Sequence, residues 1–277
     1  MKIAVTGAGG YIGAHVVDEA ISRGHEVIAV DINLKNISDK AIKKSLDIFG
    51  VHHNLFEALG KPDVLIHLAW RDGFIHNSEQ HMQNLSSHIN FIRDFVKSGG
   101  KNVAIMGSMH EIGYHEGAVD ENTPTNPQSH YGIAKNAMRE SLLLATEELG
   151  FNLCWLRAYY IFGDDEYGSS IFSKLTRAAK NGDTTFPFTT GKNLYDFIHV
   201  KDLAKMIVAA SVQNTVTGVI NVATGRATSL ADQVEWFIEQ NGWDIKLEYG
   251  VFPDRPYDSP GIWADATRIE EIMRNYD

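Results

Sequence analysis

Residues 2–13, KIAVTGAGGYIG, decide the fold of this chain. A short apolar run is followed at once by a glycine-rich turn, and residues 13–23 then carry apolar side chains at helical spacing. Glycine is required in such a turn because the backbone bends tightly and must approach the phosphates of a ligand closely. The first turn of the following helix presents free N–H groups to that negative charge. We therefore predict a pyrophosphate-binding turn, with cofactor contacts from Gly7, Gly10, Tyr11, Ile12 and Gly13.

An acidic residue ends the next apolar run. Residues 26–30, EVIAV, read as a buried strand, and Asp31 follows directly. A carboxylate at this place accepts hydrogen bonds from the adenosine ribose of NAD and repels the 2′-phosphate of NADP. The sequence therefore predicts a preference for NAD, although the nearby Lys35 would weaken it. We expect Ile32 and Asn33 to contact the cofactor beside Asp31.

Short apolar runs alternate with longer amphipathic segments along the rest of the chain. Strand, helix, strand at this rhythm indicates a parallel sheet covered by helices on both faces. A glycine turn between the first strand and the first helix is typical of the Rossmann-type, doubly wound α/β fold. Further strands are predicted at 63–68, 102–106, 153–157, 197–200 and 218–222, and helices at 78–98, 130–149, 169–181 and 201–212.

The alternating rhythm breaks after residue 163. Residues 164–195 are rich in Gly, Thr and Asp, and the tail from 228 combines helical stretches with a Pro-containing segment. We predict a dinucleotide-binding domain made of 1–163 and 197–223. A smaller, discontinuous substrate-binding lobe is expected from 164–196 and 224–277.

Composition excludes several classes of protein. Hydrophobic residues make up 44% of the chain, which allows a sizeable core, and the formal charge of −10 argues against a nucleic acid or an anionic membrane as the main partner. The single cysteine, Cys154, permits no internal disulfide. No apolar stretch is long enough to cross a membrane, and the first residues do not resemble a signal peptide, so we expect a cytoplasmic protein.

Three polar residues form a candidate catalytic set. Tyr131 and Lys135 are spaced i, i+4 and therefore share one face of a predicted helix. An ammonium group near a tyrosine lowers the pKa of its hydroxyl and makes it a usable proton donor and acceptor. Ser108 lies just past the end of a predicted strand, where its hydroxyl can hold a substrate carbonyl beside Tyr131.

Together these motifs resemble the extended short-chain dehydrogenase/reductases, in the NAD-dependent epimerase/dehydratase group that acts on nucleotide sugars. The resemblance covers nearly the whole chain. It rests on TGAGGYIG at 6–13, HLAW at 67–70, GSMHEIG at 107–113, YGIAK at 131–135, LRAYYIFG at 156–163, YDFIHVKD at 195–202 and RPYDSPGIWADATRI at 255–269.

The resemblance implies specific roles for residues of this chain. Ser108, Tyr131 and Lys135 become the catalytic set, with Tyr131 and Lys135 also touching the cofactor. Arg255 is implied to bind the diphosphate of the sugar nucleotide, for which its planar guanidinium is suited. The two long helices, 78–98 and 130–149, are implied to form a four-helix homodimer interface. Further cofactor contacts are implied for Asp47, Ile48, Leu68, Ala69, Trp70 and Asn84.

The sequence departs from the family pattern on the substrate side. Tyr160 and Tyr195 stand where many members carry asparagine and arginine, which disfavours a standard UDP-hexose epimerase. Met109 and His110 replace the Asp–Glu pair with which 4,6-dehydratases eliminate water, and Glu111 is one position late and is expected to point elsewhere. HLAW, where many relatives have HLAA, resembles reductases of 4-keto-6-deoxy sugars.

These features leave several functions open, in a definite order. A 4-ketoreductase of a 4-keto-6-deoxyhexose nucleotide leads, and a nucleotide-sugar 4-epimerase is the alternative. A catalytically inactive dinucleotide sensor is disfavoured because Ser108, Tyr131 and Lys135 are all present, and a reductase of a non-sugar carbonyl is disfavoured by Arg255.

Two side chains near the catalytic set have open roles. His110 is either a substrate contact or an ordinary loop residue, and Trp70 either lines the nicotinamide side of the cleft or packs there. Met109, Tyr160 and Tyr195 are also expected on the substrate side. The many histidines lack the spacing of a metal site, so no metal is expected.

Overall fold

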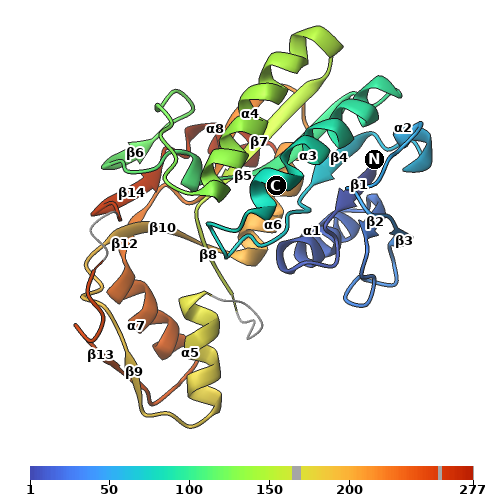
Figure 1. The fold of residues 1–277 in the computed structure, drawn as a ribbon. Coiled ribbons are helices and arrows are strands. Elements are labelled where there is room, and N and C mark those ends of the chain that lie inside the picture. The colour runs from blue at the N-terminus through green and yellow to red at the C-terminus, as the bar shows by residue number, and fades with distance from the viewer. Residues whose placement is uncertain (164–169, 255–257, 277) are drawn as a thin grey trace.

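The computed structural model describes residues 1–163, 170–254 and 258–276. Its centre is a seven-stranded parallel sheet in the order β11-β7-β5-β4-β1-β2-β3 (Figure 1). This confirms the Rossmann-type fold. The strands are β1 Lys2–Thr6, β2 Glu26–Asp31, β3 Ile42–Ser45, β4 Val64–His67, β5 Asn102–Ser108, β7 Asn152–Ala158 and β11 Gly218–Val222.

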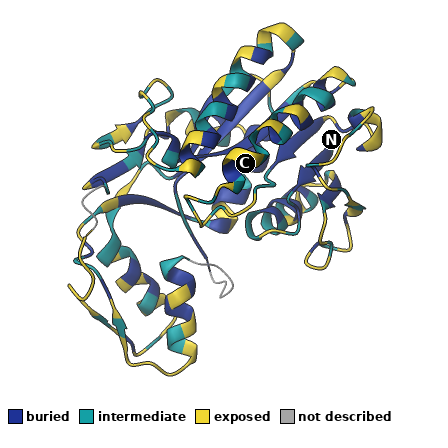
Figure 2. Ribbon diagram, in the orientation of Figure 1, coloured by how far each residue is buried: buried dark blue, intermediate teal, exposed yellow. Residues whose placement is uncertain are grey.

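Side chains alternate between the two faces of the sheet. In β1, Ile3 and Val5 join one apolar cluster and Ala4 joins the other. Both clusters are covered by helices, so the strands of the sheet other than the exposed edge strand β3 are buried along most of their length (Figure 2).

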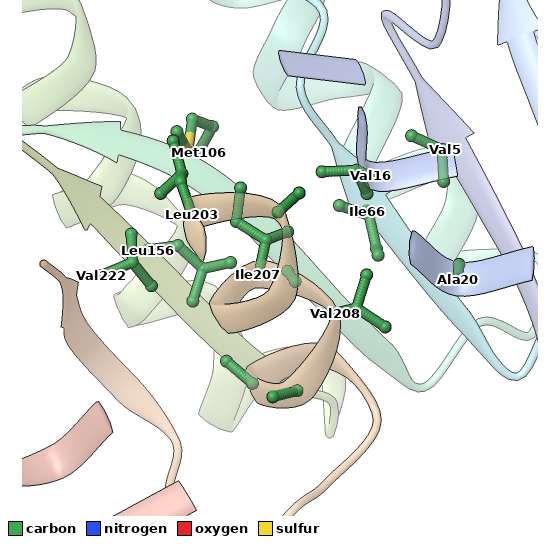
Figure 3. Close-up of a cluster of buried hydrophobic side chains, with 14 of the residues drawn as sticks. Val5, Val16, Ala20, Ile66, Met106, Leu156, Leu203, Ile207, Val208 and Val222 are labelled. Atoms are coloured by element: carbon green, nitrogen blue, oxygen red, sulfur yellow. The ribbon is translucent and has the colours of Figure 1, made fainter. Parts of the chain in front are cut away.

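Three helices cover the first face: α1 Tyr11–Ser22, α6 Val200–Ser211 and α8 Thr267–Arg274. Leu203, Ile207 and Val208 of α6 pack against the sheet, close to side chains of β5 and β7 (Figure 3). The opposite face is covered by α2 Leu55–Ala58, α3 Gln80–Lys97 and α4 His130–Leu149. None of the described helices is long and apolar enough to span a membrane.

A second, smaller part of the molecule extends from the carboxyl end of the sheet (Figure 1). Its sheet has the order β12-β10-β14-β6, and β8 also pairs with β10. These strands are β6 Gly117–Val119, β8 Tyr160–Phe162, β10 Leu194–His199, β12 Ala227–Ser229 and β14 Gly261–Ala264. The helices α5 Ile171–Lys180 and α7 Leu230–Gln240 lie beyond it, with the parallel pair β9 Thr185–Pro187 and β13 Lys246–Glu248.

The predicted division into two domains stays a prediction, but the strand pairing bears on its boundaries. The boundary between 196 and 197 falls inside β10, which begins at Leu194 and is one continuous strand. β6 and β8 pair within the second sheet, although both fall in the range predicted for the dinucleotide-binding domain. Three-residue strands give too little alternation to be assigned from sequence.

The Asp196 side chain connects three segments of the second part of the molecule. Its side chain is fully buried and accepts hydrogen bonds from the N–H groups of Thr224 (2.9 Å), Gly225 (2.8 Å) and Ala264 (3.2 Å), and from the Thr224 hydroxyl (2.6 Å). One carboxylate thereby joins β10 to the turn after β11 and to β14. Buried N–H groups without a partner are costly, so this carboxylate is a structural centre.

We expect Asp196→Ala to lower the free energy of unfolding by about 3 kcal/mol or more, because it leaves several buried donors unpaired. Urea unfolding followed by circular dichroism measures the change. Asp244→Ala, at an exposed position of the same lobe, is the matched control and should change stability by less than about 0.5 kcal/mol. Equal stability of the two variants would contradict the role of Asp196.

Candidate active site

The glycine turn packs tightly against the end of β4. Gly7 has a φ of 70°, and a Cβ atom on it would lie 2.6 Å from the backbone nitrogen of Ala69. A Cβ on Gly13 would lie 2.0 Å from the Gly7 carbonyl oxygen. Only glycine fits both positions, so the first turn of α1 lies directly behind the cleft between β1 and β4. This cleft is where the strand order reverses, which is the place where such sheets bind ligands.

A pocket opens at this cleft. Nine of the predicted cofactor residues line it: Gly7, Gly10, Asp31, Ile32, Asp47, Ile48, Leu68, Ala69 and Trp70. Tyr11, Ile12 and Gly13 belong to the first turn of α1, and Asn33 follows β2, but none of these four is among the lining residues. Asn84 lies on α3, where its amide donates to Gln80 Oε1 (3.2 Å), and it does not line the pocket either.

The pocket has the chemistry that a nicotinamide dinucleotide needs. The glycine backbone leaves room for phosphates at the N-terminus of α1. The Asp31 carboxylate is held at the edge of the pocket by the N–H groups of Gly9 (2.9 Å) and Asn33 (3.1 Å). An oriented carboxylate here suits a ribose hydroxyl, so the residues present fit NAD.

Four lining residues were not predicted from the sequence: Val30, Leu46, Phe49 and Arg71. Leu46 and Phe49 follow β3, an edge strand of sequence IKKS. Its polar residues form no apolar run, so the strand was not predicted. Arg71 follows Trp70, and its guanidinium lies 4.4 Å from the centre of the Phe49 ring. Its position just after a strand end is the sequence feature that could have identified Arg71 as a pocket residue.

The structure brings Ser108, Tyr131 and Lys135 together where β5 ends and α4 begins. Ser108 is the last residue of β5. Its hydroxyl accepts a hydrogen bond from the His110 N–H (3.3 Å) and lies close enough to the Tyr131 hydroxyl to lower the pKa of that group. Tyr131 lies in the first turn of α4, and its backbone N–H donates to the His76 carbonyl (2.8 Å). Lys135 is buried, and its ammonium donates to the Met106 carbonyl (2.7 Å).

Burial sets the protonation of this group. It raises the pKa of Tyr131 to about 12, against the hydrogen bond from Ser108, which lowers it. Burial also lowers the pKa of Lys135 to about 7, against the negative charge of Glu111, which raises it. At neutral pH the tyrosine therefore holds its proton, while the lysine is close to its titration point.

Aromatic and imidazole rings surround Tyr131. The rings of Trp70, His76, His81 and His110 have centroids 6.0, 5.6, 5.3 and 5.8 Å from that of Tyr131. His110 also lies 4.3 Å from His76, and burial, followed by the charge on His76, lowers its pKa to about 4. His110 is therefore a neutral imidazole at neutral pH, and its ring lies beside Tyr131.

Glu111 points away from this ring cluster, as expected. It is fully buried and accepts hydrogen bonds from the Ser108 N–H (2.7 Å) and from Trp155 Nε1 (2.9 Å). Arg157 and Arg139 lie 3.4 and 3.6 Å from its carboxylate. The carboxylate therefore supports Ser108 from behind and does not reach the side where Tyr131 lies.

The expected substrate-side residues are only partly described. Tyr160 and Tyr195 stack on each other across β8 and β10, with centroids 4.0 Å apart. Met109 is buried in the apolar cluster of the second part. Arg255 lies outside the described residues. Among the residues that the structure does describe, no group of three or more His, Cys, Asp or Glu side chains is placed to hold a metal ion.

Similar proteins agree with this geometry. The dTDP-6-deoxy-L-talose 4-dehydrogenase (NAD(+)) of Aggregatibacter actinomycetemcomitans is 39% identical over 269 residues, which cover 95% of this chain and 99% of that enzyme. The UDP-glucose 4-epimerase of Thermotoga maritima, solved with UDP-glucose, is 26% identical with a TM-score of 0.83 and covers 98% of this chain and 92% of its own. MoeE5, in complex with UDP-glucuronic acid and NAD, is 26% identical with a TM-score of 0.81, and the match covers 99% of this chain and 93% of MoeE5.

The sequence model of the NAD dependent epimerase/dehydratase family matches residues 3–223. That range contains the glycine turn, the Asp31 carboxylate and all three catalytic candidates. The chain belongs to the NAD-dependent epimerase/dehydratase family.

Proposed function

We propose that this chain is an NAD-dependent oxidoreductase that reduces the 4-keto group of a nucleotide-activated 6-deoxyhexose. The observation that supports this proposal is that the side chains of Ser108 and Tyr131 lie next to each other, with Lys135 one helical turn away, beside the glycine-lined pocket. The dehydrogenase relative is named for oxidation at carbon 4 of a dTDP-linked 6-deoxy sugar. Its name therefore supports both the position of the reaction on the sugar and the class of sugar.

The chain's own residues supply the proton chemistry. A bound nicotinamide ring supplies the hydride for the carbonyl carbon. Tyr131 donates its proton to the carbonyl oxygen, and Ser108 donates a hydrogen bond that holds this oxygen in place. The Lys135 ammonium, 5.9 Å from the centre of the Tyr131 ring, stabilises the tyrosinate that remains.

The same residues disfavour dehydration. Elimination of water needs an acid and a base beside the sugar ring, and the two positions after Ser108 carry Met109 and His110. Met109 cannot transfer a proton, and the Glu111 carboxylate is engaged by Ser108, Trp155 and Arg157. Reduction without dehydration therefore accounts best for the side chains present.

The substrate contacts belong to this proposal. We assign Ser108, Met109 and His110 to the sugar, and Tyr160, Tyr195 and Arg255 to the part of the substrate bound by the second lobe. The stacked pair Tyr160–Tyr195 replaces polar side chains that many family members carry, so it presents a flatter and more apolar wall. We assign cofactor binding to the domain made of 1–163 and 197–223. Substrate binding is assigned to the lobe made of 164–196 and 224–277.

A cytoplasmic homodimer through α3 and α4 completes the proposal. The outer sides of these helices carry the exposed apolar residues Met82, Ile133 and Leu144, which are exposed by 44, 40 and 79%. Exposed apolar side chains on two neighbouring helices favour burial against a second copy.

Stoichiometry tests the reaction. We expect one NADH to be consumed for each molecule of a dTDP-4-keto-6-deoxyhexose reduced, measured by the loss of NADH absorbance and by chromatography of the sugar nucleotide. The 4-epimerase is the second candidate, supported by the Thermotoga maritima relative. Conversion of UDP-glucose to UDP-galactose without added reductant would establish that alternative and overturn the reductase.

Substitution of the tyrosine tests the proton donor. Tyr131→Phe should lower kcat by roughly 10²–10⁴-fold while leaving the Kd for NADH nearly unchanged, because only the hydroxyl is removed. Tyr159→Phe is the matched control, since Tyr159 is buried and its hydroxyl donates to Asn221 Oδ1 (3.4 Å) away from Tyr131. Near-normal turnover of Tyr131→Phe would remove this residue from the mechanism.

The choice of cofactor depends on Asp31. NADH should bind roughly 10-fold or more tightly than NADPH, which is the scale of one charge-assisted hydrogen bond. Asp31→Asn should narrow this gap because it removes the charge that repels the 2′-phosphate but keeps an acceptor. Fluorescence titration measures both Kd values, with the exposed Asp39→Asn as control. Tighter binding of NADPH by the unmodified protein would contradict the assignment.

A further inference from the structure

The indole ring of Trp70 lies against the side chain of Lys135. The Lys135 ammonium is 3.8 Å from the centre of the Trp70 ring, which is well within the distance of a cation–π interaction. It is 5.9 Å from the centre of the Tyr131 ring, so the indole is the nearer of the two aromatic faces.

Trp70 is held in place from several directions. Its Nε1 donates to His81 Nδ1 (3.0 Å), and His81 Nε2 lies 3.0 Å from the Ile75 carbonyl. A carbonyl can only accept, so His81 Nε2 carries the proton and Nδ1 is free to accept from the indole. The indole also stacks on His88, with centroids 4.4 Å apart and an interplanar angle of 14°.

His88 is in turn anchored in the core of the sheet. Its Nδ1 lies 2.9 Å from His67 Nε2, and His67 Nδ1 lies 2.8 Å from the Thr6 hydroxyl on β1. Burial lowers the pKa of His67 to about 3 and that of His88 to about 2, so both rings are neutral. The support behind the indole therefore adds no positive charge that would repel Lys135.

Few other contacts stabilise the charged form of Lys135. The residue is 3% exposed, and its ammonium donates a hydrogen bond to the Met106 carbonyl. The titratable and charged groups that act on Lys135 directly are Glu111 after β5, His67 of β4, His88 of α3 and Tyr131 of α4. Behind them, Arg139 of α4 and Arg157 of β7 lie against Glu111, Arg71 acts on His88, and His81 of α3 contacts Trp70 and Tyr131. Glu111 is the only carboxylate among these described groups, and two arginines share it.

We propose that Trp70 is a positioning residue whose indole face holds the Lys135 ammonium charged and in place one helical turn from Tyr131. The proposal rests on the proposed role of Lys135 in proton transfer. The indole stabilises the charged form and therefore raises the pKa of the lysine. Activity that requires this charge is present below the pKa of Lys135 and is lost as the pH rises through it.

NMR spectroscopy of the protein labelled with ¹³C at the lysine ε carbons tests the contact without turnover. The ε-methylene protons of Lys135, assigned with Lys135→Met, should resonate upfield of those of the other lysines because they lie over an aromatic ring. In Trp70→Leu this upfield shift should vanish, and the titration midpoint of Lys135 should fall by roughly 0.4 to 1.5 pH units, the range that cation–π energies correspond to. The pKa that describes the alkaline fall of kcat/KM should decrease by the same number of pH units.

Two further variants separate a positioning role from a merely structural one. Trp70→Phe keeps an aromatic face and should lower the midpoint by less than Trp70→Leu does, with part of the upfield shift retained. Trp236→Leu removes a half-exposed indole from α7 and should leave both signals unchanged.

An ordinary ε-methylene shift for Lys135 in the unmodified protein would overturn the proposal, and so would an unchanged midpoint in Trp70→Leu and Trp70→Phe. If Trp70→Leu does not fold, the unmodified protein and Trp70→Phe still decide the question. Neither NMR readout depends on the substrate, so a wrong choice of sugar would show in the turnover assays and leave these signals as expected.

Discussion

The close approach between the glycine turn and the end of β4 is the constraint on which the site depends. Gly7 lies so near Ala69 that no side chain fits between them, and a Cβ atom on Gly13 would lie even nearer to the Gly7 carbonyl oxygen. This contact places the N-terminus of α1 at the cleft between β1 and β4. It also determines where the chain leaves β4, and so carries Trp70 and Arg71 to the rim of the same pocket.

A second constraint acts behind the candidate catalytic residues. Glu111, Arg139 and Arg157 are charged side chains with almost no exposure, and one carboxylate serves both guanidinium groups. Such an arrangement is stable only when its members are held by further hydrogen bonds, which Ser108 and Trp155 supply. Ser108 is therefore oriented at its hydroxyl by the His110 N–H and at its backbone by a buried charge cluster.

Sequence reasoning succeeded where one signal was strong and local. The strands at 2–6, 26–31 and 102–108 are apolar runs, and the structure has them nearly as predicted. It missed β3, whose sequence IKKS is polar because the strand lies at the sheet edge. The predicted strand 197–200 begins earlier, at Leu194, because Tyr195 and Asp196 are buried by partners from distant parts of the chain.

The sequence by itself determined the Rossmann-type fold and pointed to the glycine turn and to Ser108, Tyr131 and Lys135 as candidates, since each depends on residue types at short, fixed spacings. Only the tertiary structure decided the surroundings of these residues. Trp70, His81, His88 and Glu111 reach the site from different elements, and their contacts depend on how β4, α3 and β5 pack. Spacing along the chain cannot specify such contacts, because packing brings together residues that are far apart in sequence.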